Sequence, residues 1–278
     1  MEGTRIVAVT KALPQYSRNT KDILPFVEKW LYGQDERLQR KVLKIFEGAA
    51  VDKRYSIMSP EEVFEATSFE DKNNVYIREV KKLGRTVLQR ALDKSGWSAD
   101  SLDYIITVSC TGIMIPSLDG DGAACVLVSS EKEAKGPRIV GEEMYHFPDA
   151  TQMMGFDLTN SGLQMILDPL VPQTIFEHFP EIIHPFLKRY GSSIEKVDHL
   201  IFHPGGKKIV ETVEDLFGVL GKNLEDTRET LRLYGNMSSA TVLYVLERFM
   251  EKDIHEGDQG LLLSFGPGFS AQRVLLEW

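Results

Sequence analysis

The sequence contains little cysteine and no long apolar run. Among its 278 residues the only cysteines are Cys110 and Cys125, each inside an apolar stretch. This low content predicts reduced thiols in a cytoplasmic protein, not a disulfide framework. No stretch approaches the ~20 apolar residues that a membrane span needs. The first residues, MEGTRIVAVT, lack the basic flank and long apolar core of a signal peptide.

Positive charge is also scarce, because 32 basic residues face 41 acidic ones and the formal net charge is −9. No run of basic residues is present. A nucleic acid or an anionic membrane attracts a positive surface, so the balance of charge argues against both as partners. The six histidines are scattered without the spacing of zinc ligands, and we expect no metal.

What is present is an alternation of helical and apolar strand-like segments, which is typical of a layered α/β fold. Apolar periodicity predicts helices after Asp22, over residues 38–49 and over residues 74–93, the last ended by Gly96. The segment SPEEVFEAT has the Ser-Pro-Glu-Glu signal of a helix start. The nearly unbroken apolar segment at residues 103–109 predicts a buried strand.

The two halves of the chain resemble each other, which predicts a duplicated architecture. SGWSADSLDYIITVSCTG is similar to YGSSIEKVDHLIFHPGG, and GDGAACVLVS is similar to GDQGLLLSFG. We therefore divide the chain into residues 1–140 and 141–278, at a charged stretch rich in Gly and Pro, EKEAKGPRIVGEE. The landmarks Asp198 and Asp258 lie 60 residues apart, whereas Asp103 and Asp121 lie only 18 apart. The N-terminal half is therefore incomplete, since the residues between its two strands cannot supply a crossover helix.

Four segments, IFHPGGKKIVETVE, YGNMSSATVLYVLERF, SFGPGFSAQRVLL and SCTGIMIPSLD, resemble the signature segments of type III polyketide synthases. These chalcone synthase-like enzymes have the thiolase fold. The resemblance runs in order over nearly the whole chain. It implies a catalytic set of Cys, His and Asn, in which His203 and Asn236 match the last two. The cysteine of that family belongs to a segment that would stand between Asp119 and Gly120, and this sequence does not contain it.

The chemistry implied by the family explains the residue types. An acyl group moves from coenzyme A to a thiolate, malonyl-CoA loses carbon dioxide, and the resulting enolate attacks the acyl thioester. Neutral N–H donors such as those of His203 and Asn236 would stabilise the enolate oxygen. Cys125 is expected to be an inert thiol inside a buried strand. Cys110 follows a strand but does not stand at the position of the nucleophile.

The resemblance also implies positions for substrate binding. The coenzyme A phosphates would be held by Lys41 and Lys44, while Gly48 stands where the family often has a third basic residue. The wall of the acyl cavity would include residues of the loop before the missing segment, of the elongation pocket and of the SFGPG loop: Thr111, Ile115, Phe156, Met165, Phe265, Gly266 and Pro267. Ile115 matches a residue that reaches across a dimer interface, and the pair Gly266 and Gly268 would allow close backbone approach.

The sequence thus predicts an acyltransferase that condenses an acyl-CoA starter with malonyl-CoA, acts as a homodimer, holds no permanent cofactor and is impaired by the missing cysteine. One alternative is a non-catalytic thiolase-like protein that binds acyl-CoA or dimerises. Another is a β-ketoacyl synthase III-like enzyme. The literal sequence is also expected to melt early or aggregate, because a buried central helix is missing.

Overall fold

The computed structural model describes residues 3–64, 68–108, 122–159, 162–218 and 220–278. Within these ranges a six-stranded sheet has the order β4-β1-β5-β10-β9-β8. Its strands are β1 (Arg5–Ala12), β4 (Ala123–Ser129), β5 (Arg138–His146), β8 (Val197–Phe202), β9 (Gln259–Gly266) and β10 (Ser270–Glu277). β2 (Tyr16–Asn19) with β3 (Lys53–Ser56), and β6 (Met154–Thr159) with β7 (Gly162–Leu167), form two small antiparallel sheets.

Eight α-helices surround these strands in the described ranges. They are α1 (Thr20–Leu31), α2 (Glu36–Gly48), α3 (Pro60–Val63), α4 (Phe69–Ser95), α5 (Val171–Arg189), α6 (Lys207–Gly218), α7 (Glu225–Tyr234) and α8 (Ser239–Met250). Short 3₁₀ turns cover Ala99–Ser101, Thr151–Met153 and Ile194–Lys196. No helix in the described part of the chain is both long and apolar enough to cross a membrane.

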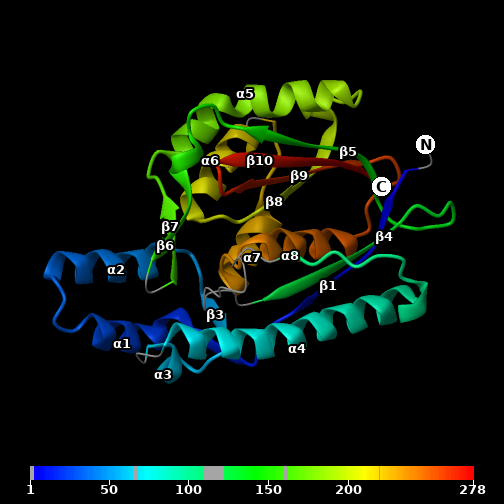
Figure 1. Ribbon diagram of the computed structural model, residues 1–278. Coiled ribbons are helices and arrows are strands. Elements are labelled where there is room, and N and C mark those ends of the chain that lie inside the picture. The colour runs from blue at the N-terminus through cyan, green and yellow to red at the C-terminus, as the bar shows by residue number, and fades with distance from the viewer. Residues whose placement is uncertain (1–2, 65–67, 109–121, 160–161, 219) are drawn as a thin grey trace.

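The elements stack in layers, which confirms the predicted layered α/β fold (Figure 1). Helix α4 covers β1 and β4, and α8 lies on the other side of these strands, between them and β8. Helices α5 and α6 cover the far side of the strands from the C-terminal part. The core around α8 is continuous from Ile6 and Val9 on β1 to Ile201 on β8 and Leu276 on β10. Helix α8 is therefore the central element of the described fold.

The local sequence signals for the helices are confirmed. Ser59 accepts a hydrogen bond from the backbone of Glu62, whose carboxylate bonds back to the Ser59 N–H in a capping box. Gly96 ends α4 in the left-handed conformation, at φ 74°, which costs glycine little. Helix α6 begins at the lysines of KKIVETVEDLF, and α8 follows the GNMS segment.

The buried strand predicted at residues 103–109 is wrong for its described part. Residues 103–108 lie in no strand, and Tyr104 and Ile106 are 90% and 88% exposed. In the C-terminal half the matching strand β8 pairs in parallel with β9, after a crossover through α6, α7 and α8. The chain between residue 108 and β4 is much shorter than that crossover. It is therefore too short to supply the crossover helix that would allow residues 103–108 to pair in parallel with β4. Within the described ranges, β4 pairs only with β1.

The stretch EKEAKGPRIVGEE does not separate two sheets, because Arg138 and the residues after it belong to β5. β1 and β5 pair through a single residue pair, Arg5 with Arg138. The division at residues 140 and 141 stays a prediction.

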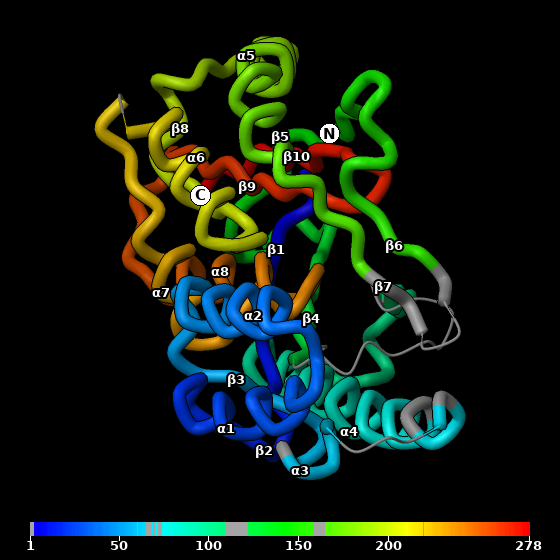
Figure 2. The backbone as a smooth tube through the Cα atoms, turned by 90° about the vertical axis from the view of Figure 1, so that its left-hand side faces the viewer, coloured from blue at the N-terminus to red at the C-terminus, as the bar shows by residue number. Residues whose placement is uncertain are grey.

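The peripheral elements α1 to α3, β2 and β3 lie together on one side of the molecule (Figure 2). Their residues line one wall of a pocket, and residues of α6 and α7 also line it. They are tied to α7 by the Asp52 N–H, which donates to the Arg232 carbonyl at 2.8 Å. The Arg232 guanidinium also pairs with the Asp52 carboxylate at 2.7 Å. These contacts join the segment between α2 and β3 to the C-terminal part of α7.

Candidate functional site

His203 follows the last residue of the parallel strand β8 and is buried, with 8% of its surface exposed. Its backbone N–H donates to the Leu263 carbonyl at 2.9 Å, which continues the pairing of β8 with β9. Its Nδ1 has no hydrogen-bond partner in the described structure. Burial lowers the pKa of His203 from 6.5 to about 4, so the imidazole is neutral at pH 7.

Asn236 lies in the turn between α7 and α8 and is joined to the loop that follows His203. Its Nδ2 donates to the Gly205 carbonyl at 3.0 Å, and its Oδ1 accepts from the Ser238 N–H at 2.9 Å. Ser238 has φ 58°, an uncommon backbone conformation for a residue with a side chain. The Asn236 side chain therefore braces a strained turn against the β8–α6 loop. The helix that follows this turn, α8, begins at Ser239.

Gly205 connects the two candidate catalytic residues. A Cβ atom placed on Gly205 would lie 3.7 Å from His203 Cδ2 and 4.0 Å from His203 Nε2. The carbonyl of the same glycine receives the hydrogen bond from Asn236. The structure thus brings the imidazole edge and the carboxamide to the same short loop, at the carboxyl end of a parallel strand.

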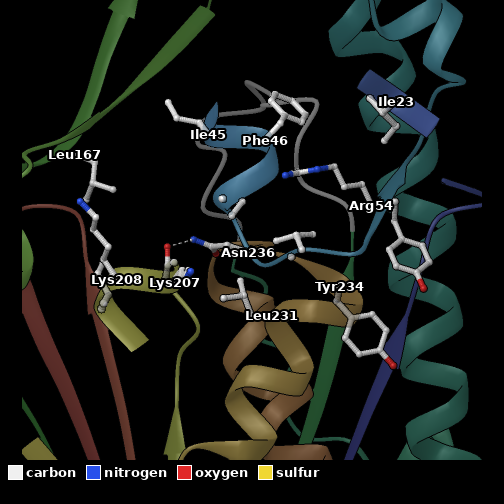
Figure 3. Close-up of a pocket in the computed structure, with 18 of the residues that line it drawn as sticks. Ile23, Ile45, Phe46, Arg54, Leu167, Lys207, Lys208, Leu231, Tyr234 and Asn236 are labelled. Atoms are coloured by element: carbon white, nitrogen blue, oxygen red, sulfur yellow. Dashed lines mark hydrogen bonds between the residues drawn. The ribbon is translucent and has the colours of Figure 1, made fainter. Parts of the chain in front are cut away.

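A pocket of about 920 Å³ opens beside this loop (Figure 3). Asn236, Gly205 and Gly206 line it, whereas His203 does not line it and lies next to Gly205. The opposite wall comes from α1 to α3 and β3, and includes Ile23, Ile45, Phe46, Val51, Met58, Val63 and Phe64. The pocket is therefore apolar over much of its wall and polar near Asn236.

The charge of the pocket is opposite to that of the whole protein. Its lining contains six basic side chains and one acidic side chain, Asp168, although the protein has a net charge of −9. The basic residues are Arg18, Lys41, Lys44, Arg54, Lys207 and Lys208. Such a local excess attracts an anionic ligand into a cavity of low dielectric constant.

Lys41 and Lys44, the two residues that the sequence predicts as phosphate contacts, both line this pocket from α2. Gly48, one turn further along α2, also lines it, and a Cβ atom there would meet nothing within 4 Å. Sequence reasoning did not identify Arg54, Lys207 or Lys208. The last two were visible as the KK that follows HPGG, whereas nothing in the sequence near Arg54 indicates a pocket.

The predicted residues of the SFGPG loop lie in the hairpin between β9 and β10. Phe265 is buried, and its ring lies 5.9 Å from that of Phe202, the residue before His203. Gly266 ends β9 and Pro267 follows in the turn. The hairpin thus packs behind the strand that carries His203, but its three predicted residues do not line the pocket.

Phe156 and Met165 face each other across the β6–β7 hairpin, and Met165 is 54% exposed. Neither lines the pocket, although Leu167 at the end of β7 and the following Asp168 do. Their assignment to an elongation cavity stays a prediction.

Cys125 lies within β4, where it pairs with Thr10 of β1 and is half-buried. Burial raises the pKa of its thiol, which agrees with the expected inert side chain. Cys110, Thr111, Ile115 and the link from Asp119 to Gly120 lie outside the described residues. Within the described ranges, no three His, Cys, Asp or Glu side chains are placed to hold a metal ion.

Comparison with known proteins identifies the relatives of this chain. Residues 140–277 match the family described as chalcone and stilbene synthases, C-terminal domain. A 1,3,6,8-tetrahydroxynaphthalene synthase of Streptomyces coelicolor is 28% identical over 314 positions, covering 85% of this chain and 82% of that protein. A putative chalcone synthase of Bacillus subtilis is 21% identical over 359 positions, covering 98% of each chain. That alignment is longer than the 278 residues here, so the relative has residues without a counterpart in this chain.

Solved structures agree with these relatives. The crystal structure of the Streptomyces coelicolor tetrahydroxynaphthalene synthase, described as a bacterial type III polyketide synthase, superposes with a TM-score of 0.86 at 25% identity. It covers 99% of both chains. The type III polyketide synthase domain of Steely1 from Dictyostelium has a TM-score of 0.87 at 17% identity, a similarity that concerns the fold alone. The thiolase-like fold expected from the sequence is confirmed.

Proposed function

The chain belongs to the chalcone and stilbene synthase family of type III polyketide synthases, and from this we propose that it binds coenzyme A thioesters and acts on malonyl-CoA. The observation that carries the proposal is the Gly205 loop. It places the Asn236 carboxamide at a pocket with an excess of positive charge, and the neutral buried imidazole of His203 lies beside the same loop. The relatives' names favour this function over the alternative of a β-ketoacyl synthase III.

The proposed reaction begins with the loss of carbon dioxide from the malonyl group. The electron pair of the breaking C–C bond moves onto the thioester, which becomes an enolate with negative charge on oxygen. Asn236 Nδ2 has two N–H groups, and the Gly205 carbonyl occupies one, which leaves the other for this oxygen. The single N–H of neutral His203 can contribute if it lies on Nε2, the nitrogen beside Gly205. Protonation of the enolate carbon by water gives acetyl-CoA.

Condensation requires a further step, the transfer of a starter acyl group to a cysteine. Cys125 is a poor nucleophile because its thiol is half-buried in β4 and its pKa is raised. We therefore propose that condensation is impaired while decarboxylation remains. We further propose that the protein is a homodimer, as the resemblance implies, and that it is cytoplasmic, in keeping with its content of only two cysteines.

The test is the conversion of malonyl-CoA to acetyl-CoA, measured by liquid chromatography. Removing one stabilising donor costs about 10²-fold in rate in comparable oxyanion sites, so His203→Gln should lower the decarboxylation rate by that order. His255→Gln is the matched control, because the His255 side chain is 94% exposed and does not line the pocket. Equal rates in His203→Gln and the parent protein would contradict the proposal.

A second candidate is a coenzyme A-binding protein without catalysis. The observation in its favour is the same Cys125, the only cysteine in the described ranges and an unsuitable nucleophile. It predicts that malonyl-CoA and acetyl-CoA bind with similar affinity and that no acetyl-CoA forms.

A further inference from the structure

Two lysines at the start of α6 face the pocket from the side opposite to α2. Lys207 and Lys208 line the pocket together with Gly205 and Gly206, while Lys41 and Lys44 line it from α2. Figure 3 shows both lysines of α6 on the far side of Asn236 from Arg54 and Tyr234. The pocket is thus bounded by lysine pairs on two elements that are distant in sequence.

These lysines are weakly neutralised in the described structure. Lys207 Nζ lies 3.9 Å from a carboxylate oxygen of Glu211. Among the described residues, Lys208, Lys41 and Lys44 have no carboxylate within ion-pair distance. The single acid of the pocket, Asp168, accepts the Leu170 N–H. Clustered cations repel one another, and a bound polyanion removes that cost.

Helix α6 adds to this positive field. Its first residues are the two lysines themselves, and the first amides of a helix have no carbonyl partner within the helix. The helix dipole therefore adds partial positive charge to the lysine charges at this end. Lysine binds phosphate as a point charge.

Position 48 adds no charge to the α2 wall of the pocket. The resemblance to type III polyketide synthases implies a third basic residue there, but Gly48 supplies no side chain. A Cβ atom at Gly48 would meet nothing within 4 Å, and the residue lines the pocket, so this part of the α2 wall is open.

We propose that Lys207 and Lys208 hold the phosphate groups of the coenzyme A thioester from the side opposite to Lys41 and Lys44, and replace the missing charge at Gly48. This inference rests on the proposed use of coenzyme A thioesters. It assigns a binding role to two residues outside the catalytic pair, and makes the phosphate site a clamp between α2 and α6.

The experiment measures coenzyme A binding by isothermal titration calorimetry. Lys207→Ala with Lys208→Ala should weaken the affinity about 10- to 100-fold, the effect of losing one or two charge-assisted hydrogen bonds. Pantetheine lacks phosphates, so its affinity should not change. The matched control is Lys188→Ala with Lys196→Ala, which removes the same charge from exposed positions outside the pocket.

A rescue variant separates charge from local structure. Gly48→Lys is added to the variant that carries Lys207→Ala and Lys208→Ala. It should raise the affinity for coenzyme A at least tenfold above that of the double variant, because it places a cation on the opposite wall. The affinity of the parent protein should also fall more steeply with salt than that of the double variant.

The outcomes distinguish this inference from the proposed function. If the parent protein binds coenzyme A and the double variant binds it equally well, the clamp is wrong while the proposed function stands. If the affinity for pantetheine falls as much as that for coenzyme A, the lysines act on the shape of the pocket and the clamp is again wrong. If the parent protein binds no coenzyme A, the proposed function itself fails.

Discussion

The Nδ2 atom of Asn236 donates a hydrogen bond of 3.0 Å to the carbonyl oxygen of Gly205, the second residue after His203. This bond joins the α7–α8 turn to the β8–α6 loop, two segments that are 31 residues apart. It also orients the carboxamide, because the other end of the same side chain accepts the Ser238 N–H. The geometry of the candidate site therefore depends on an amide that both donates and accepts.

Asn236→Asp should disrupt this connection. A carboxylate cannot donate to the Gly205 carbonyl and places two acceptors side by side, while it keeps the bond from Ser238. We expect the unfolding free energy to fall by about 1 kcal/mol, the usual contribution of one hydrogen bond. The rate of malonyl-CoA decarboxylation should fall by a larger proportion. Urea unfolding and the decarboxylation assay provide the measurements. Asn223→Asp is the control, since the Asn223 side chain only accepts a hydrogen bond, from the Glu225 N–H.

The stability of the protein should depend on pH through His203. Its pKa is lowered from 6.5 to about 4 in the folded state, so the unfolded chain binds a proton more readily between these values. The unfolding free energy is therefore not reduced by His203 above pH 6.5. It decreases by roughly 3 kcal/mol in total as the pH falls from 6.5 towards 4. In His203→Gln this part of the pH dependence should disappear. The measurement is urea unfolding at pH 7 and pH 4.5, and an equal pH dependence in both proteins would show that His203 is not the titrating group.

The helix ends and the main motifs could be predicted because their signals are local. Ser59 with Glu62, and Gly96, determine helix boundaries through contacts within a few residues. The position of His203 after a strand also follows from a short apolar run with Gly-Gly behind it. Such features do not depend on the rest of the fold.

The pocket wall and the state of residues 103–108 could not be predicted, because both depend on distant partners. Arg54 and Phe46 line the pocket, and the segment that carries them is attached to α7 through Asp52 and Arg232, which lie 180 residues apart. The segment 103–108 has the composition of a buried strand, but a strand needs a neighbour and a connection that reaches it. Composition alone does not show whether either is present.

The junction between β1 and β5 should be sensitive to a single methyl group. Gly136 has φ 117°, and a Cβ atom there would lie 2.0 Å from the Ile6 carbonyl oxygen. Gly136→Ala should therefore lower the unfolding free energy by about 2 kcal/mol or more, since both backbone strain and a clash oppose it. Gly84→Ala is the matched control. It lies within α4 with open space around it, and should raise stability by about 0.5 to 1 kcal/mol. Thermal unfolding followed by circular dichroism compares the two, and equal stability of both variants would contradict the close approach of Gly136 to Ile6.

Incubation with an acyl-CoA should leave the protein without a covalent acyl group. Cys125 is half-buried with a raised pKa, so its thiolate is scarce at pH 7. Intact mass spectrometry should show one unchanged species, and peptide mapping should find no adduct at Cys125. A stoichiometric adduct at Cys110 would show instead that this residue can act as the nucleophile.

The last prediction concerns the exposed apolar segment at residues 103–108. Tyr104, Ile105, Ile106 and Val108 are between 67% and 90% exposed, and on β4 the Val128 side chain is 49% exposed. A short apolar, β-branched segment without charge after Asp103 favours association between chains. We therefore expect the parent protein to aggregate with increasing concentration. Ile106→Lys should increase the soluble fraction with little change in Tm, because the side chain it replaces is exposed.

Thr107→Lys is the matched control for this variant, since it adds the same charge to the same segment but leaves the isoleucines in place. Light scattering against protein concentration, together with the melting curve, provides the measurement. If only the added charge matters, both variants will improve solubility equally; if the apolar surface drives association, Ile106→Lys will improve it more. A parent protein that does not aggregate at high concentration and melts sharply at high temperature would show that residues 103–108 are covered in solution, and that the fold is stable as the sequence stands.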